Sequence, residues 1–334
     1  MRWKAFVLLL LMVLQGSRLA AQTTIKLGTL VPKGSPWYDI LKEMGEKWKT
    51  ESGGSVQLKI FAGGIAGDES DMVRKLRIGQ LQSAAVTTVG LGSIDQATVA
   101  LQIPLAFNSY EELDYVRDRI APRLEAILLQ RGFVVLNWGD AGWVHFFVQS
   151  PTVHVSDVRG MKLFTWAGDP AAVELWKDSG FHPVPLATTD VLPALQTGLI
   201  NTYVTTPIFA LSSQWFPFTK YMIDVKWAPL TGATIINKSA WDKIPTAMQS
   251  VLMKSAKEAG VKLRLEIRNK EKDAIDAMVK RGLHVLPLSA AEEKEWVDLA
   301  HNGYARIRGN LVPADFFDEV IKLRDDYRKS KPVK

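Results

Sequence analysis

The stretch 246–281 constrains the fold most strongly, because its only glycine is Gly260 and it contains no proline. As a single helix it would be roughly 54 Å long at 1.5 Å per residue, which is longer than one small domain. We therefore expect a helix that runs along two domains. Two shorter helices broken at Gly260 are the alternative that the sequence leaves open.

The remaining chain alternates between two kinds of apolar pattern, short β-like runs and helical stripes that begin at capping residues such as Ser35, Asp68 and Ser109. Predicted strands lie at 24–30, 56–60, 83–89, 133–138, 143–148, 162–166, 183–186, 200–205 and 234–237. A β-α-β order is typical of a parallel sheet with helical crossovers. We therefore predict an α/β protein with two domains and a long helix that spans both.

The N-terminus has the layout of a secretory signal peptide. A basic start is followed by the apolar run 5–14 and by Leu19-Ala20-Ala21, which can end a cleavage site. An uncleaved membrane anchor is the alternative. We expect residues 1–21 to be the signal peptide of a periplasmic protein. We place the first domain at 22–142 and 231–270, and the second at 143–230 and 271–334.

Charge and composition exclude several functions. The chain has 41 Lys and Arg against 35 Asp and Glu, and removal of residues 1–21 lowers the net charge from +6 to +3. That excess is too small for a nucleic-acid-binding surface. Cysteine is absent, so disulfides, thiolate metal sites and cysteine nucleophiles are excluded.

Catalytic patterns are weak. The five histidines show no zinc-binding spacing, and there is no GxSxG or GxxxxGK[ST] motif. The segment 62–67 (AGGIAG) lies between a strand and a helix like a dinucleotide loop, but Ala62 replaces the first glycine and the acid expected about twenty residues later is missing. We predict a glycine turn there, and neither an enzyme, a cofactor nor a metal site.

Aromatic residues gather near the predicted passage between the two halves. Trp138, Trp143, Phe146, Phe147, Phe164 and Trp166 lie within this short part of the chain. Such rings supply a large contact area with few rotatable bonds and suit a ligand cage. Ordinary core packing is the alternative for each of them.

Five segments, in this order and spacing, carry a family resemblance: 61–69 (FAGGIAGDE), 103–107 (IPLAF), 158–163 (VRGMKL), 190–198 (DVLPALQTG) and 237–245 (NKSAWDKIP). With them the chain resembles the extracytoplasmic solute-binding subunits of tripartite ATP-independent periplasmic (TRAP) transporters, the DctP-like family. The resemblance implies two α/β domains that close on a solute, bridged by a long helix. It also implies delivery to an ion-gradient-driven membrane permease and, in one subfamily, an accompanying periplasmic helical-repeat protein.

The sequence departs from that family at the ligand-binding charges. Where the family places an arginine that clamps a substrate carboxylate, this chain has Phe164, and a second arginine aligns near Val144. A family asparagine aligns with Thr205 or Thr206, and a nearby acid with Val204. The chain would thus be an atypical member that lacks the carboxylate-clamping arginine.

Burying an unpaired carboxylate costs several kcal/mol, whereas a phenyl ring packs well against ligand carbon. We therefore expect a small neutral ligand, apolar or amphipathic. The alternative is an organic-acid binder in which another cation has replaced the arginine; Lys162, Lys33 and Arg74 are the candidates.

The resemblance and strand parity together give a set of predicted ligand-binding residues: Trp37, Glu69, Val86, Thr87, Thr88, Val144, Phe164, Trp166, Tyr203 and Thr205. The alternatives are core packing for Trp37, a helix-dipole acid for Glu69 and plain strand propensity for the threonines.

The predicted function is capture of a ligand by domain closure, with hinge strands near 138–143 and 205–207. A sensor or interaction protein of the same fold, without import, is the competing class. A secreted hydrolase has no residues to support it.

Overall fold

The computed structural model describes residues 22–331. The predicted signal peptide lies outside the described residues. The strands are β1 (Thr23–Thr29), β2 (Val56–Phe61), β3 (Ser83–Thr87), β4 (Phe133–Val148), β5 (Lys162–Trp166), β6 (His182–Leu186), β7 (Thr202–Thr205), β8 (Tyr221–Asn237) and β9 (His284–Leu286). The α-helices are α2 (Pro36–Glu51), α3 (Glu69–Arg77), α4 (Thr88–Gly92), α5 (Tyr110–Gln130), α6 (Val155–Arg159), α7 (Pro170–Asp178), α8 (Val191–Thr197), α9 (Pro207–Ser212), α10 (Lys238–Trp241), α11 (Thr246–Val279), α12 (Ala290–Ile307) and α13 (Ala314–Ser330). Short 3-10 helices lie at η1 (Gln96–Gln102), η2 (Thr188–Asp190) and η3 (Phe216–Phe218).

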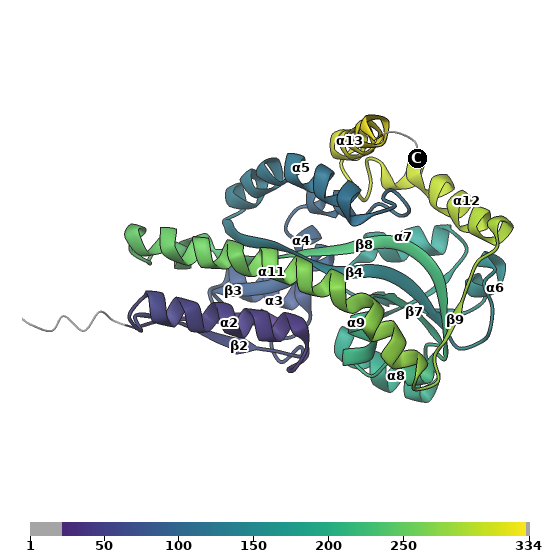
Figure 1. Ribbon diagram of the computed structural model, residues 1–334, viewed down its shortest axis with the longest axis horizontal. Coiled ribbons are helices and arrows are strands. Elements are labelled where there is room, and N and C mark those ends of the chain that lie inside the picture. The colour runs from purple at the N-terminus through teal and green to yellow at the C-terminus, as the bar shows by residue number, and fades with distance from the viewer. Residues whose placement is uncertain (1–21, 332–334) are drawn as a thin grey trace, which may run out of the picture.

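The strands form one sheet in the order β2-β1-β3-β8-β4-β7-β5-β6, with β9 added beside β8. Strands β1, β2 and β3 are parallel, and β5, β6 and β7 form a second parallel group. The antiparallel strands β4 and β8 join the two groups and run through both halves of the molecule (Figure 1). The predicted α/β class is confirmed.

Both connecting strands are longer than the sequence predicts. The predicted strands 133–138 and 143–148 are one strand, β4, and β8 begins well before the predicted 234–237. The pairing of β4 with β8 has register shifts at 135–137, 140–142 and 144–146. These irregularities let β4 continue through Asp140 and Gly142, which are unfavourable residues in a regular strand. Strand β8 was not predicted over its full length because it contains Pro229 and Gly232, and both residue types usually interrupt a strand.

Helix α11 is continuous through Gly260 and has 34 residues, so the prediction of one spanning helix is confirmed. A Cβ at Gly260 would lie 2.6 Å from Cβ of Asn137, so glycine allows α11 to approach β4 closely. Figure 1 shows α11 crossing in front of both halves, and the helix contacts α2, β4 and α9.

The last helix returns to the N-terminal half. Helix α13 packs on α5 and η1, and Phe316, Phe317 and Val320 join the same apolar core as α5 (Figure 1). Our predicted boundaries assign residues 271–334 to the second domain. These boundaries remain a proposal. With them, α13 belongs to the second domain by sequence and packs on the first domain in space.

A buried charge cluster lies where β4 passes beneath α11. The carboxylate of Asp140 accepts hydrogen bonds from Arg117 Nη1 at 3.0 Å and from Arg268 Nη2 at 2.6 Å. The Asp140 side chain is 1% exposed and that of Arg117 is 3% exposed. Arg268 also pairs with Asp114 of α5. The cluster ties β4, α5 and α11 together at the predicted hinge.

Candidate functional site

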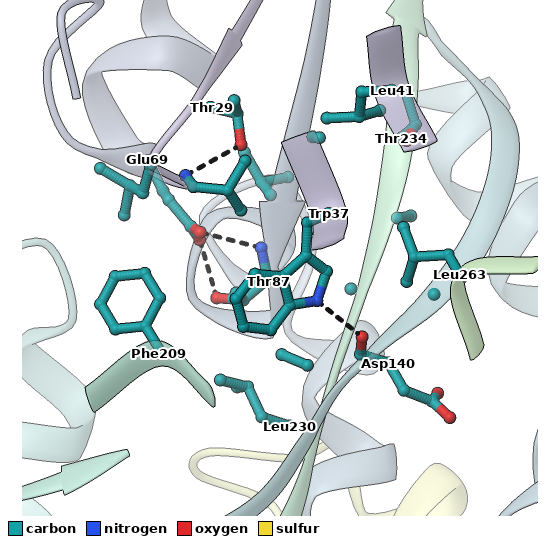
Figure 2. A pocket seen from close by; sticks show the side chains of 18 of the residues that line it. Thr29, Trp37, Leu41, Glu69, Thr87, Asp140, Phe209, Leu230, Thr234 and Leu263 are labelled. Atoms are coloured by element: carbon teal, nitrogen blue, oxygen red, sulfur yellow. Dashed lines mark hydrogen bonds between the residues drawn. The ribbon is translucent and has the colours of Figure 1, made fainter. Parts of the chain in front are cut away.

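The first cavity, which we call cavity 1, lies beside β4 and β8 and has an empty volume of about 800 Å³ including the part open to solvent. Trp37 of α2 lies centrally in it, and its indole Nε1 donates to the main-chain oxygen of Asp140 at 3.2 Å (Figure 2). Ser35 caps α2 and Pro36 occupies its first position, which fixes Trp37 in the first turn. The rest of the lining is mainly apolar and includes Leu41, Val86, Phe209, Leu230 and Leu263.

Glu69 forms one wall of cavity 1 and is 2% exposed. Its carboxylate accepts from the main-chain N–H of Thr87 at 2.9 Å, from the Thr87 hydroxyl at 2.8 Å and from the N–H of Gly90 at 2.7 Å. Figure 2 shows the two bonds with Thr87. Burial raises the pKa of Glu69 to about 7, although these donors oppose the rise. The carboxyl group therefore fixes the turn from β3 into α4.

This burial predicts a pH dependence of stability. Raising the pKa of Glu69 from 4.5 to about 7 corresponds to about 3 kcal/mol. Below pH 4.5 the group is protonated in both states; as pH rises from 4.5 through 7, only the unfolded state readily loses the proton, so stability falls. In Glu69→Gln this contribution to the slope is absent. Chemical denaturation at pH 4 to 8 measures it, with Asp71→Asn as an exposed control on the same helix. A slope equal to the wild type in Glu69→Gln would contradict the assignment.

A second cavity, cavity 2, lies between α4, η1, β5, α7 and α12, with an empty volume of about 1110 Å³ including open solvent. Phe164, Thr165 and Trp166 of β5 line it, together with Trp176 of α7 and Trp227 of β8. Trp166 and Leu230 line both cavities, so the two are neighbours.

The N-terminus of α3 contacts the second half of the chain directly. Asp68 caps α3, and its carboxylate also accepts from the N–H of Thr188 at 2.9 Å and from its hydroxyl at 3.2 Å. The indole of Trp166 in turn donates to the Thr188 hydroxyl at 3.1 Å. A Cβ at Gly64 would lie 2.9 Å from Cγ2 of Thr189, so the glycine turn permits this approach. We call the Asp68–Thr188–Trp166 contact the latch.

Nine of the ten predicted ligand-binding residues line one of the cavities. Cavity 1 has Trp37, Glu69, Val86, Thr87 and Thr205, cavity 2 has Thr88, Val144 and Phe164, and Trp166 lines both. The tenth, Tyr203, lines neither: its ring stacks on Phe147 at 5.0 Å and its hydroxyl accepts from Thr219. Strand parity with Thr205 suggested a position at the cleft, but the Tyr203 side chain is packed among core side chains.

Other lining residues were not predicted from the sequence. Thr188 follows β6, and a residue just beyond the carboxyl end of a parallel strand is a usual ligand position, so this signal was available. Asp140 and Trp227 come from the continuations of β4 and β8, and Phe209 comes from the short helix α9; no clear sequence pattern indicates these segments.

The described lining of both cavities contains no lysine or arginine. Of the cations considered as replacements, Lys162 donates to the carbonyl of Gly198 and Arg74 pairs with Asp71, and neither these nor Lys33 are among the lining residues. The carboxyl groups present are Glu69, Asp140 and Asp169.

Each of these acids already has donors within the protein. Asp140 is paired with two arginines, and Glu69 accepts three hydrogen bonds. Asp169 caps α7 by accepting from the N–H of Ala172, and burial raises its pKa. The arrangement can enclose a small molecule, and the acids among its described lining residues are already engaged by donors of the protein itself.

Known proteins resemble the chain over most of its length. The 2,3-diketo-L-gulonate-binding periplasmic protein YiaO of Escherichia coli K12 is 22% identical over 311 residues, which cover 92% of this chain and 91% of the relative. The C4-dicarboxylate-binding periplasmic protein DctP of Rhodobacter capsulatus is 23% identical over 261 residues, 77% of each chain.

Solved structures share the fold. A TRAP periplasmic solute-binding protein from Haemophilus influenzae with bound L-gulonate has a TM-score of 0.84 at 20% identity, covering 91% of this chain and 99% of that one. The corresponding protein from Shewanella oneidensis with bound succinate has a TM-score of 0.85 at 17% identity, covering 91% of this chain and 100% of that one.

The family model for bacterial extracellular solute-binding proteins, family 7, matches residues 27–309. Within residues 22–331 no helix is long and apolar enough to cross a membrane. The chain belongs to this family, the DctP family of TRAP solute-binding proteins.

Proposed function

We propose that this protein captures a small neutral ligand, apolar or amphipathic, by closing its two halves, and delivers it to a TRAP-type permease driven by an ion gradient. The observation that carries the proposal is the absence of lysine and arginine from the described lining of both cavities. An ionised carboxylate in such a site would lose its hydration without gaining a partner, at a cost of several kcal/mol.

Relatives of this chain bind acids, among them L-gulonate and succinate. This member would differ because it has Phe164 at the position where the resemblance places the clamping arginine. Phe164 is 2% exposed and packs edge-on against Trp166, with ring centroids 4.9 Å apart. Its ring provides apolar contact for a ligand and no charge.

The ten predicted residues are proposed as the ligand-binding set, with Tyr203 supporting the others from the core. Export through the signal peptide at residues 1–21 would place the protein in the periplasm, where members of this family act. TRAP solute-binding proteins work with membrane permease subunits, and these are the proposed partners. An accompanying helical-repeat protein is proposed only as a feature of one subfamily. We propose no catalytic activity.

Two competing functions make different predictions. A sensor of the same fold would bind ligand but would not require a permease. Deletion of the genes for the TRAP permease subunits would therefore leave its signalling intact. A conventional organic-acid binder with a relocated cation would hold a carboxylate against lysine or arginine. The buried ion pairs of Arg117 and Arg268 with Asp140 argue against those two arginines as the relocated cation.

The ligand itself provides the first test. Native mass spectrometry of protein purified from the periplasm, followed by extraction and identification of the bound compound, is expected to yield a neutral molecule. Small-angle scattering before and after removal of this compound should show a more compact bound form. A bound organic acid would contradict the proposed ligand class, and unchanged dimensions would contradict closure.

The latch gives a further prediction. Thr188→Val removes the hydroxyl that donates to Asp68 and accepts from Trp166, while it keeps the shape of the side chain. Two hydrogen bonds worth about 1 kcal/mol each are lost, so ligand affinity is expected to fall about thirtyfold and the open form to become more populated. Thr189→Val is the matched control, because it keeps the Cγ2 contact with the glycine turn. Equal affinities in the two variants would refute a role for the latch.

A further inference from the structure

Two cavities lie side by side in the cleft region of the protein. The two have empty volumes of about 1110 and 800 Å³, counting open solvent, and they meet at Trp166 and Leu230. Their linings come from different elements: α2, α3 and α9 contribute only to cavity 1, whereas α7, α12 and η1 contribute only to cavity 2. The site therefore has two chambers rather than one.

The chambers differ in chemistry. Hydroxyl groups of Thr87, Thr188 and Thr205 lie around cavity 1. Cavity 2 has an aromatic wall in which Trp176 and Trp227 pack with ring centroids 5.9 Å apart and an interplanar angle of 30°. Phe164 is also a lining residue, and its ring packs against Trp166 and Trp215. Flat aromatic surfaces of this kind favour a ring in the ligand.

One polar group in cavity 2 lacks a partner. Thr165 is 3% exposed and is a lining residue of cavity 2. Its hydroxyl oxygen is buried and makes no hydrogen bond with any described residue. Cavity 2 is also lined by Asp169, whose carboxylate accepts a hydrogen bond from the N–H of Ala172. An unpaired buried hydroxyl has a free-energy cost unless a ligand or a water supplies the missing bond.

We infer that the ligand is a two-part neutral molecule: a compact hydrogen-bonding head that occupies cavity 1, joined to a ring that occupies cavity 2 and carries a hydroxyl or N–H group toward Thr165. This inference rests on the proposed function, because it assigns the two parts of the same neutral ligand to separate chambers. Trp166, which lines both chambers, would contact the junction between head and ring.

The test uses four probes of one shape series: acetamide as the head alone, phenylacetamide as head and ring, 4-hydroxyphenylacetamide as head, ring and hydroxyl, and phenylacetate as the charged counterpart. Isothermal titration calorimetry is run on the full mature chain. Ala172→Trp fills cavity 2, and Ala171→Trp, one residue earlier on α7, is the matched control because Ala171 does not line the cavity. Thr165→Val removes the unpaired hydroxyl and keeps the shape of the side chain.

In the wild type, phenylacetamide is expected to bind at least about tenfold more tightly than acetamide, and the phenolic hydroxyl to add about a further threefold to tenfold. Ala172→Trp should abolish the gain from the ring, and Thr165→Val only the gain from the hydroxyl, whereas Ala171→Trp should keep both. Far-UV circular dichroism and thermal unfolding check that each variant is folded.

Each other outcome overturns a defined part of the account. If phenylacetamide binds but keeps its full advantage in Ala172→Trp, the two-chamber assignment is wrong while the neutral-ligand proposal stands. If phenylacetate binds more tightly than phenylacetamide, the neutral-ligand proposal itself fails. If neither ring-bearing amide binds more tightly than acetamide, cavity 2 does not accept a ring and the inference is overturned.

Discussion

Phe164→Ala is expected to lower ligand affinity about tenfold to hundredfold and the free energy of unfolding by about 3–5 kcal/mol. We propose that the affinity falls because Phe164 is a lining residue of cavity 2 and its ring packs against Trp166, which lines both cavities. The stability falls because the ring is buried against Trp166 and Trp215. Titration with the co-purified ligand and chemical denaturation measure the two effects separately.

Phe147→Ala separates binding from stability. Phe147 is fully buried in the same apolar cluster as Phe164, but it lines neither cavity. The control should therefore lose a similar amount of stability and keep its ligand affinity. Equal affinity in Phe164→Ala and the wild type would remove Phe164 from the site.

Asp140→Asn is expected to lower the free energy of unfolding by about 3–5 kcal/mol, because it leaves the guanidinium groups of Arg117 and Arg268 with too little compensating charge. Both arginines would keep their ion pairs with Asp114, but Arg117 is almost fully buried and would lose its 3.0 Å bond to the Asp140 carboxylate. Urea denaturation of the ligand-free protein measures the loss.

Asp118→Asn is the control for that charge cluster. Asp118 lies 3.9 Å from Arg117, but its side chain is 72% exposed, so its removal should change stability by less than about 1 kcal/mol. Comparable losses in both variants would mean that burial at the crossing of β4 and α11 does not set the cost.

The sequence predicted those elements in which local preferences agree with the fold. Helix α2 begins at the predicted cap Ser35, α3 at Asp68 and α5 at Ser109, because each has a side-chain oxygen that accepts from the first turn. The long helix was predicted because no residue in 246–279 stops it strongly, and the close approach at Gly260 even requires a glycine.

The connecting strands were predicted poorly, since tertiary contacts override their local signals. Asp140 is a poor residue for a buried strand, yet two arginines from distant helices neutralise it. Gly232 interrupts the β-pattern, but a Cβ there would lie 2.5 Å from the main-chain oxygen of Val86, so the neighbouring strand demands glycine. Neither partner can be inferred from local sequence.

Most residues of the candidate site could be placed from the sequence, but not the arrangement of the two cavities. Strand parity and family resemblance placed nine of ten residues on cavity walls. They did not show that Trp166 lines both cavities, nor that Thr188 bonds to Asp68 of the other half, because both contacts depend on how α7 and η2 pack against the first half.

Matched acid and amide pairs test the central claim most directly, since the members of a pair differ in charge and hardly in shape. Calorimetry would compare D-glucuronate with D-glucuronamide, succinate with succinamide and phenylacetate with phenylacetamide on the wild-type chain. Because the described lining residues include no lysine or arginine, the amide should bind at least about tenfold more tightly in every pair that binds. An acid that binds more tightly than its own amide would contradict the account.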